Sequence, residues 1–373
     1  MSRFSGGTLV AVLAVSLCCG AAEQSEPPAG TGVLWEARTM AAQARQEVQA
    51  ASNAALAGKS EAFREHEIKA GEMFEKARKL FEEAGGMELR DAEALADFAG
   101  VLHSLNDSDL AADALRKATR LEPDNPALWL ALGRGLLSPL YRRPAEAEDA
   151  LKHAARIGAG DAVEGEARAV LGRLYWDKGL SDFAEREWLR TLEVAPENTL
   201  ARIGMAAVLV RRGEMVAASE RVEEAVQESP GALALAGELL GKGLEDFERS
   251  GLWFEDTAKA HFAYASLLLR AGRYAESIGP LRRTVKLEPE NHVAWNMIGS
   301  ISAQLGRVEQ AREAFERSLA LNPDQERTRE ALKALPERSS KEESEESPVG
   351  LNGGDTMPLE PQGSGSVSPG ASK

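Results

Sequence analysis

The sequence contains very little cysteine, few aromatic residues and no excess of basic charge. Its two cysteines are adjacent, at Cys18 and Cys19, and aromatic residues make up 5% of the 373 positions. Two neighbouring cysteines cannot supply a disulfide framework or a cysteine-based zinc site for the rest of the chain. The 59 acidic side chains outnumber the 44 basic ones, which gives a net charge of -15. Because nucleic-acid binding depends on clustered lysine and arginine, this charge disfavours DNA and RNA as partners.

Motifs that carry chemistry are also missing. The dipeptide His66-Glu67 is not followed by a second histidine one helical turn on, so it does not form a zinc-binding H-E-x-x-H motif. Residues 133–135 and 241–243 are Gly-x-Gly sequences without the third glycine and preceding strand of a dinucleotide-binding loop. We therefore predict no catalytic residue, no metal and no cofactor, and a protein that is not an enzyme. An enzyme built on the irregular residues 233–257 remains the alternative.

The first 22 residues have the profile of a signal peptide. A short basic start precedes the apolar residues 8–19, a stretch too short to span a bilayer, and small residues suit a cut after Ala22. We expect an exported protein, periplasmic or secreted. Lipid attachment at Cys18 or Cys19 is the alternative. The match to a lipoprotein box is imperfect, because the bulky Leu17 stands where that box has a small residue. In that case the protein would be membrane-anchored as a lipoprotein, through the lipid on its N-terminal cysteine alone.

The prolines reveal an internal repeat. Pro196 and Pro230 are 34 residues apart, as are Pro289 and Pro323, and each follows a short run of apolar and polar residues such as LEVAP or LALNP. Pro123 ends the same phrase 73 residues before Pro196, a distance that fits one repeat of 34 residues and one of 39 with a small insertion. A fixed period of this length is the mark of a repeat architecture.

Each unit reads as two helices joined by a tight turn. Small residues recur 12 positions apart, as in Gly172 with Ala184 and Gly299 with Ala311, and they let two helices approach closely. Between the two small residues lies a glycine, at Gly179, Gly213, Gly272 and Gly306 in four of the units. The closing proline ends the second helix because it lacks a backbone N–H donor.

These residues resemble the tetratricopeptide repeat family, whose unit of 34 residues opens with W-x2-L-G-x2-Y and closes with proline. Two units carry the pattern most fully, with Leu171, Gly172, Tyr175, Gly179, Ala184, Trp188 and Pro196 in one and Trp295, Gly299, Gly306, Ala311, Phe315 and Pro323 in the other. The resemblance implies an all-α fold, a right-handed superhelical solenoid of antiparallel helix pairs. Together with the signal profile it indicates an exported bacterial member of the family.

The domain boundaries follow from this register. We predict a signal peptide at 1–22, an N-terminal helical hairpin or capping region at 34–91, a solenoid at 92–335 and a disordered acidic tail rich in Ser, Pro and Gly at 336–373. A partner-binding coiled coil is the alternative for the hairpin. The expected repeats are 92–125, 126–164, 165–198, 199–232, 258–291 and 292–325, with a polar cap at 326–335. Residues 233–257 read as one helix and a loop.

The resemblance also places a partner-binding groove on the first helix of each unit, at its second, fifth, ninth, twelfth and thirteenth residues. The candidate groove residues are Leu130, Arg134, Arg173, Trp176, Asp177, Arg211, Phe262, Arg270, Asn296 and Gln304. Spaced aromatic and arginine side chains are typical anchors for peptide partners. Trp176 and Phe262 could instead simply fill the space between helices.

We therefore predict a non-enzymatic scaffold that binds a protein or peptide in its groove. Some family members clamp a partner's terminal carboxylate with Lys and Asn, but the matching positions here hold Ala169 and Arg173, or Ile203 and Ala207. We do not expect that activity. The alternative function is a lipid-anchored assembly factor for an envelope machine such as a pilus, secretion or cell-wall complex.

Overall fold

The structure is a computed structural model that describes residues 32–56, 59–138, 142–229 and 232–336. The predicted signal peptide, both cysteines and the tail from residue 337 lie outside the described residues. Within those ranges every regular element is a helix. None of the helices there is long and apolar enough to cross a membrane.

The helices follow one another in pairs along the chain. An N-terminal hairpin, α2 (Gly32–Leu56) and α3 (Ser60–Glu83), is followed by the single turn η1 (Gly86–Glu88). Six pairs then form the body of the molecule: α4 (Ala92–Ser104) with α5 (Ser108–Leu121), α6 (Pro126–Leu136) with α7 (Pro144–Ile157), α8 (Ala162–Asp177) with α9 (Ser181–Val194), α10 (Thr199–Arg211) with α11 (Met215–Glu228), α13 (Ala258–Arg270) with α14 (Tyr274–Leu287), and α15 (His292–Gln304) with α16 (Val308–Leu321). The unpaired helices are α12 (Ala232–Ser250) and α17 (Glu326–Ala334).

Short sequence signals define the ends of these helices. The side chains of Asp91, Asp161 and Asn198 accept hydrogen bonds from backbone N–H groups in the first turns of α4, α8 and α10. The turn between the two helices of a pair needs a left-handed residue, which is Gly179 (φ 76°) after α8 and Asn106 (φ 64°) after α4. The turn therefore has a fixed length and the second helix runs back along the first.

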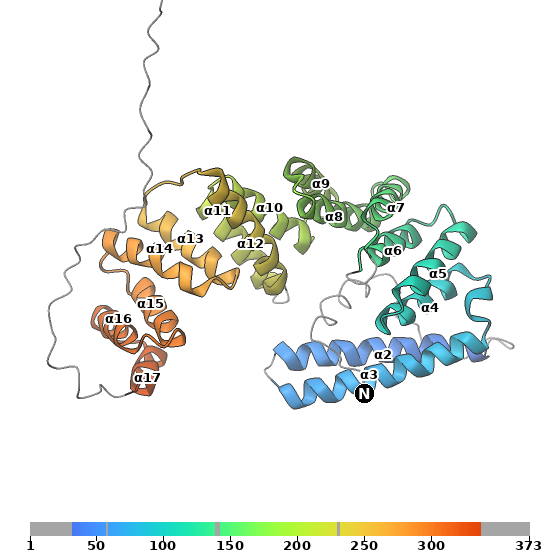
Figure 1. Ribbon diagram of the computed structural model, residues 1–373, viewed down its shortest axis with the longest axis horizontal. Coiled ribbons are helices and arrows are strands. Elements are labelled where there is room, and N and C mark those ends of the chain that lie inside the picture. The colour runs from blue at the N-terminus through green and yellow to red at the C-terminus, as the bar shows by residue number, and fades with distance from the viewer. Residues whose placement is uncertain (1–31, 57–58, 139–141, 230–231, 337–373) are drawn as a thin grey trace, which may run out of the picture.

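The pairs stack into an arch, with the first helix of each pair towards the inner side (Figure 1). The buried apolar residues form three clusters along the arch, at its N-terminal, middle and C-terminal parts. Trp129 packs against both the N-terminal and the middle cluster. The core is thus distributed along the repeats, as expected of a solenoid in which each unit contacts its neighbours. The predicted all-α solenoid of antiparallel helix pairs is confirmed.

Glycines on the first helices make room for aromatic rings of the second helices. A Cβ on Gly172 would lie 2.4 Å from the indole nitrogen of Trp188, and a Cβ on Gly299 would lie 2.5 Å from the ring of Phe315. Both rings are almost completely buried. The small residues identified in the sequence therefore permit close packing against a bulky partner.

Polar contacts tie neighbouring pairs together. Glu148 of α7 accepts hydrogen bonds from Lys152, from Lys178 (2.6 Å) at the end of α8, and from Tyr175 (3.0 Å). Burial alone would raise the pKa of Glu148, but these three donors favour the carboxylate and bring its pKa down to about 2. The contact joins the second pair to the third through a charged group.

Helix α12 departs from the pairing. It has no second helix, and α13 packs directly on α11 as the next pair would. Instead α12 lies against α10 on the inner side of the arch (Figure 1). The approach is close, because a Cβ on Gly243 would lie 2.8 Å from the carbonyl oxygen of Ala207. The inserted helix therefore covers part of the surface that the repeats would otherwise leave open.

Candidate functional site on the inner side of the arch

Two of the ten predicted groove residues are core residues. Leu130 and Trp176 are each 1% exposed, and the ring of Trp176 packs against that of Trp188 with centroids 5.7 Å apart. Their side chains are not open to a partner, which corrects their assignment to a binding surface. Trp176 fills space between helices, the alternative that the sequence left open.

Arg134 is engaged within the solenoid. It is 13% exposed, and its guanidinium lies 2.5 Å from a carboxylate oxygen of Glu166. The pair joins the inner helices α6 and α8. Arg134 therefore holds two units together, and its charge is already matched.

Helix α12 covers the predicted residues of α8. Arg173 lies 3.0 Å from Asp177 and also forms an ion pair with Glu238 of α12. Lys242 of α12 donates to the backbone carbonyls of Trp176 and Asp177, the latter at 3.0 Å. These are the last two carbonyls of α8, and that of Trp176 also accepts from the backbone N–H of Gly179 at 3.0 Å. Arg173 and Asp177 therefore bind the chain's own helix.

The N-terminal hairpin covers the inner side of the first pair in a similar way. Arg38 of α2 lies 2.7 Å from Asp97 and 2.8 Å from Glu93, and Arg45 lies 3.6 Å from Asp97. Glu93 is the second residue of its unit, one of the positions that the resemblance assigns to the groove. The chain's own helices thus occupy the inner side at α4 and again at α8 and α10.

Arg211 lies apart from the other candidates. It is the last residue of α10, 41% exposed, and its nearest acidic partner is Asp182 at 3.7 Å, at the start of α9. The contact with Asp182 places the side chain of Arg211 near the turns that join paired helices, rather than on the inner side. The structure therefore does not bring Arg211 together with the remaining candidates.

The last four candidates lie on two successive inner helices. Phe262 and Arg270 belong to α13, and Asn296 and Gln304 occupy the same two positions 34 residues later on α15. The same register brings in Ser266, Val293 and Ser300, which we did not select from the sequence although the repeat places them at the second and ninth positions of their units. We call these seven residues the α13–α15 face.

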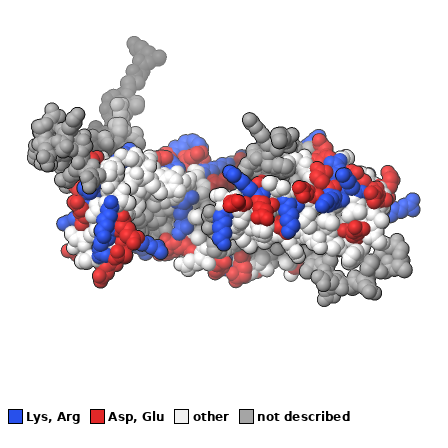
Figure 2. Space-filling view, turned by 90° about the horizontal axis from the view of Figure 1, so that it is seen from below, with Lys and Arg blue, Asp and Glu red and all other residues white. Residues whose placement is uncertain are grey.

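The α13–α15 face is partly apolar and open. Val293 is 46% exposed, Ser300 and Gln304 are exposed, and Phe262 is half-buried against the C-terminal core cluster. Figure 2, seen from the open side of the arch, shows a largely uncharged area in the left-hand part of the molecule, where the C-terminal pairs lie. Charged side chains surround it.

The electrostatics of this face are unusual for such an acidic chain. Neither α13 nor α15 contains an Asp or Glu residue. Arg270 forms no ion pair or hydrogen bond with any side chain of the described part of the chain. The side-chain oxygen of Asn296 accepts a hydrogen bond from Thr328 of α17 at 3.1 Å, which leaves its amide N–H groups free to donate. The face therefore offers donors and apolar surface, and no carboxylate of its own.

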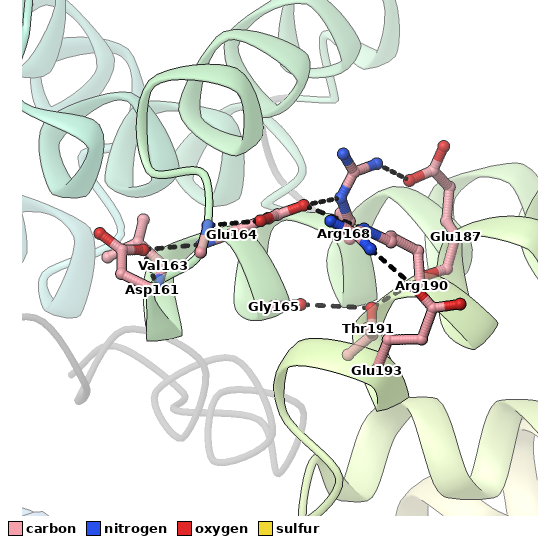
Figure 3. Close-up of polar contacts among 10 residues, drawn as sticks. Asp161, Val163, Glu164, Gly165, Arg168, Glu187, Arg190, Thr191 and Glu193 are labelled. Carbon is pink, nitrogen blue, oxygen red and sulfur yellow. Dashed lines mark hydrogen bonds and ion pairs between the residues drawn. The ribbon is translucent and has the colours of Figure 1, made fainter.

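The most buried carboxylate of the described residues has a structural role. Glu164 accepts hydrogen bonds from the backbone N–H of Gly160 and from Arg168, both at 2.7 Å, and from Arg190 at 3.4 Å. Figure 3 shows how Glu164, Arg168 and Arg190 lie together. The bond from Gly160 lowers the pKa of Glu164. Arg168 also reaches Glu187 of α9 at 2.9 Å. These groups join α8 to α9, and their hydrogen-bonding and charge requirements are met within the protein.

In the described ranges, no group of three His, Cys, Asp or Glu side chains is placed to hold a metal ion.

Comparison with known proteins supports the repeat assignment. Sequence models of the tetratricopeptide repeat match residues 92–125, 170–232 and 265–326. The chain therefore contains tetratricopeptide repeats, as its prolines and glycines predicted. It is 30% identical over 147 residues to a peptidyl-prolyl cis-trans isomerase of Arabidopsis thaliana, FKBP42. That match covers 37% of this chain and 37% of the length of the curated relative.

Several solved structures are similar at low sequence identity. Yeast Tom70 is 18% identical, with 87% of this chain and 68% of that chain covered and a TM-score of 0.42. YrrB, described as a TPR protein with an unusual peptide-binding site, is 18% identical, with coverage of 70% and 97% and a TM-score of 0.29. Pseudomonas aeruginosa pilF is 12% identical, with coverage of 64% and 95% and a TM-score of 0.37.

Proposed function

We propose that this protein is a non-enzymatic scaffold that binds a segment of a partner protein on the α13–α15 face. Tetratricopeptide repeats are in general a protein-interaction fold. The observation that carries the proposal is that the side chains of Phe262, Arg270, Asn296 and Gln304 form no hydrogen bond or ion pair with α2 or α12, whereas such contacts hold α2 on α4 and α12 on α8. Helix α12 also packs against part of α13, where its Glu248 accepts a hydrogen bond from Tyr264 at 2.8 Å.

The residue types on this face suit an extended peptide. A peptide has backbone carbonyl groups that need donors when they leave water, and Arg270, Asn296 and Gln304 supply N–H groups. Phe262 and Val293 supply apolar surface for side chains. Two neighbouring helices with equivalent residues 34 positions apart can contact successive parts of one peptide.

The proposal is tested by placing a photo-reactive amino acid at Gln304 and, as a control, at Gln310 on the outer helix α16. We expect a partner protein to be crosslinked from position 304 and not from position 310. The variant Phe262→Ala with Arg270→Ala should then lower crosslinking at least tenfold, because aromatic and arginine anchors dominate interface energies.

A matched control pair exists on an outer helix. Phe183 is half-exposed on α9 and Arg186 lies over its ring at 5.3 Å, so Phe183→Ala with Arg186→Ala removes the same residue types elsewhere. This variant should capture the partner as the wild type does. Equal losses in both double variants, or no loss in either, would contradict the assignment of the α13–α15 face.

Export is part of the proposal. It rests on the sequence of residues 1–22, and the N-terminal residue of the mature protein tests it: we expect Glu23 after cleavage. The second candidate, a lipid-anchored assembly factor, is favoured by the adjacent Cys18 and Cys19. Replacing both by Ser should release the protein from membranes if a lipid is attached there. An unchanged distribution between membrane and soluble fractions would reject the anchor.

A further inference from the structure

The C-terminal repeats differ in charge from the rest of the protein. Residues 258–336 contain 12 Lys and Arg against 9 Asp and Glu, a net charge of +3 in a chain whose total is -15. The two inner helices of this part carry Lys259 and Arg270 and no acidic side chain. Lys259 lies 3.2 Å from Glu220, whereas Arg270 is unmatched among the described side chains. The C-terminal part of the inner side, where Arg270 is unmatched, therefore has the positive balance that favours an acidic ligand.

The sequence that follows these repeats is acidic. Residues 337–373 contain 7 Asp and Glu against 3 Lys and Arg, and four of the glutamates fall within residues 342–346. Pro348, Val349 and Leu351 come directly after them. This order of charged and then apolar residues matches the two kinds of surface on the α13–α15 face, the guanidinium of Arg270 and the apolar side chains.

The acidic segment begins close enough to reach that face. Thr328 of α17 contacts Asn296 of the α13–α15 face at 3.1 Å, and the carbonyl of Pro336 accepts a hydrogen bond from Arg312. Eight residues separate Thr328 from Pro336, which is about 12 Å along a helix at 1.5 Å per residue. Residues 337–342 span up to about 20 Å when extended. The glutamates can therefore reach the face without any movement of the helices.

We propose that residues 342–351 of this chain occupy the α13–α15 face and compete with the partner for it. The glutamates lie at Arg270 and the donors of Asn296 and Gln304, and the apolar residues that follow pack on Phe262. The inference rests on the proposed function of this face. A tethered segment has an effective concentration on the order of 1 mM. A tail with an intrinsic dissociation constant of about 0.1 mM would then fill the face about nine-tenths of the time and weaken partner binding roughly tenfold.

The test uses a fluorescein-labelled synthetic peptide with the sequence of residues 340–352 and full-length protein. The protein is compared with a variant in which the four glutamates of 342–346 are replaced by Gln, so that chain length is unchanged. We expect fluorescence anisotropy to show the peptide binding about tenfold more tightly to the Gln variant than to the wild type. Addition of Arg270→Glu to the Gln variant should abolish binding, and salt near 1 M should weaken it.

The outcomes separate this inference from the proposed function. Equal affinity for wild type and Gln variant would show that the tail does not occupy the face, while leaving it as a peptide-binding surface. No binding to either protein would reject the tail as a ligand, and the crosslinking from Gln304 would then decide the proposed function by itself. Binding that persists with Phe262→Ala and Arg270→Ala would place the peptide elsewhere and overturn the inference.

A second measurement locates the tail directly. In a background with Cys18→Ser and Cys19→Ser, the substitutions Gln304→Cys and Ser344→Cys should form an intramolecular disulfide under mild oxidation at low protein concentration. Gln310→Cys with Ser344→Cys, on the outer side of the same pair, is the control and should form it at least tenfold more slowly. Equal rates for the two pairs would mean that the tail has no preferred site.

Discussion

The packing of Trp188 gives the sharpest stability prediction. Its ring is fully buried between α8 and α10, in contact with two glycines, and its indole N–H donates to the carbonyl of Ala169 at 3.1 Å. A Cβ added at Gly172 would lie 2.4 Å from the indole nitrogen, and one added at Gly204 would lie 2.4 Å from the other side of the ring system. We therefore predict that Gly172→Ala destabilises the middle of the solenoid.

Three contributions set the expected loss in the free energy of unfolding of Gly172→Ala. An ordinary contact needs about 3.4 Å, so the ring must move by about 1 Å, and the backbone at Gly204 blocks that movement. Overpacking of this kind costs about 1–3 kcal/mol. Weakening of the indole hydrogen bond costs up to about 1 kcal/mol, and the better helix propensity of Ala returns about 0.5–1 kcal/mol. The net loss should be about 2 kcal/mol.

Urea unfolding followed by circular dichroism at 222 nm measures the loss, and hydrogen exchange should localise it to α8–α10. Gly241→Ala in α12 is the matched control, because a Cβ there meets no atom within 4 Å; it should be neutral or slightly stabilising. Trp188→Phe combined with Gly172→Ala should recover part of the loss, since the smaller ring leaves room. If Gly172→Ala unfolds at the same urea concentration as Gly241→Ala, the proposed close packing is refuted.

Three further predictions concern other parts of the arch. Gly299→Ala should lower the free energy of unfolding of the C-terminal pairs by about 1–3 kcal/mol, since its Cβ would lie 2.5 Å from the ring of Phe315; an unchanged urea midpoint would contradict this. Gly243→Ala should loosen α12, because its Cβ would lie 2.8 Å from the Ala207 carbonyl oxygen, and hydrogen exchange should rise in α12 but not in α15. Glu148 titrates at about 2 when folded and near its ordinary 4.5 when unfolded, so its stabilising contribution is complete above pH 4.5 and is lost as the pH falls towards 2. Glu148→Gln should flatten that part of the pH dependence of the urea midpoint, and an unchanged profile would show that the carboxylate is not held by its donors.

Much of the repeat could be predicted because its constraints are local. Gly179 is needed where the turn takes a positive φ, and Gly172 is needed where a bulky ring approaches the helix. Both requirements recur in several units, so they appear as a period in the sequence. The family match over 170–232 includes both glycines.

The groove residues were harder to predict because exposure depends on neighbouring units. Position within the repeat puts Phe262 and Asn296 at equivalent sites, but it does not distinguish them from Leu130 and Trp176, which are buried. A residue can occupy a groove position in the repeat register and still be covered by the next helix. Residue type does not indicate which of them is buried, since Trp176 and Phe262 are both aromatic.

By itself the sequence determined the helix pairs, their turns and the places where two helices come close, because those features depend on residues near one another in the chain. Only the tertiary structure decided which part of the inner side stays open. The helix at 232–250 and the hairpin at 32–83 could have been placed anywhere that buries their apolar residues; contacts such as Arg173 with Glu238 and Arg38 with Asp97 set them against the inner helices. Those contacts join residues 59 and 65 positions apart, a separation that no local pattern encodes.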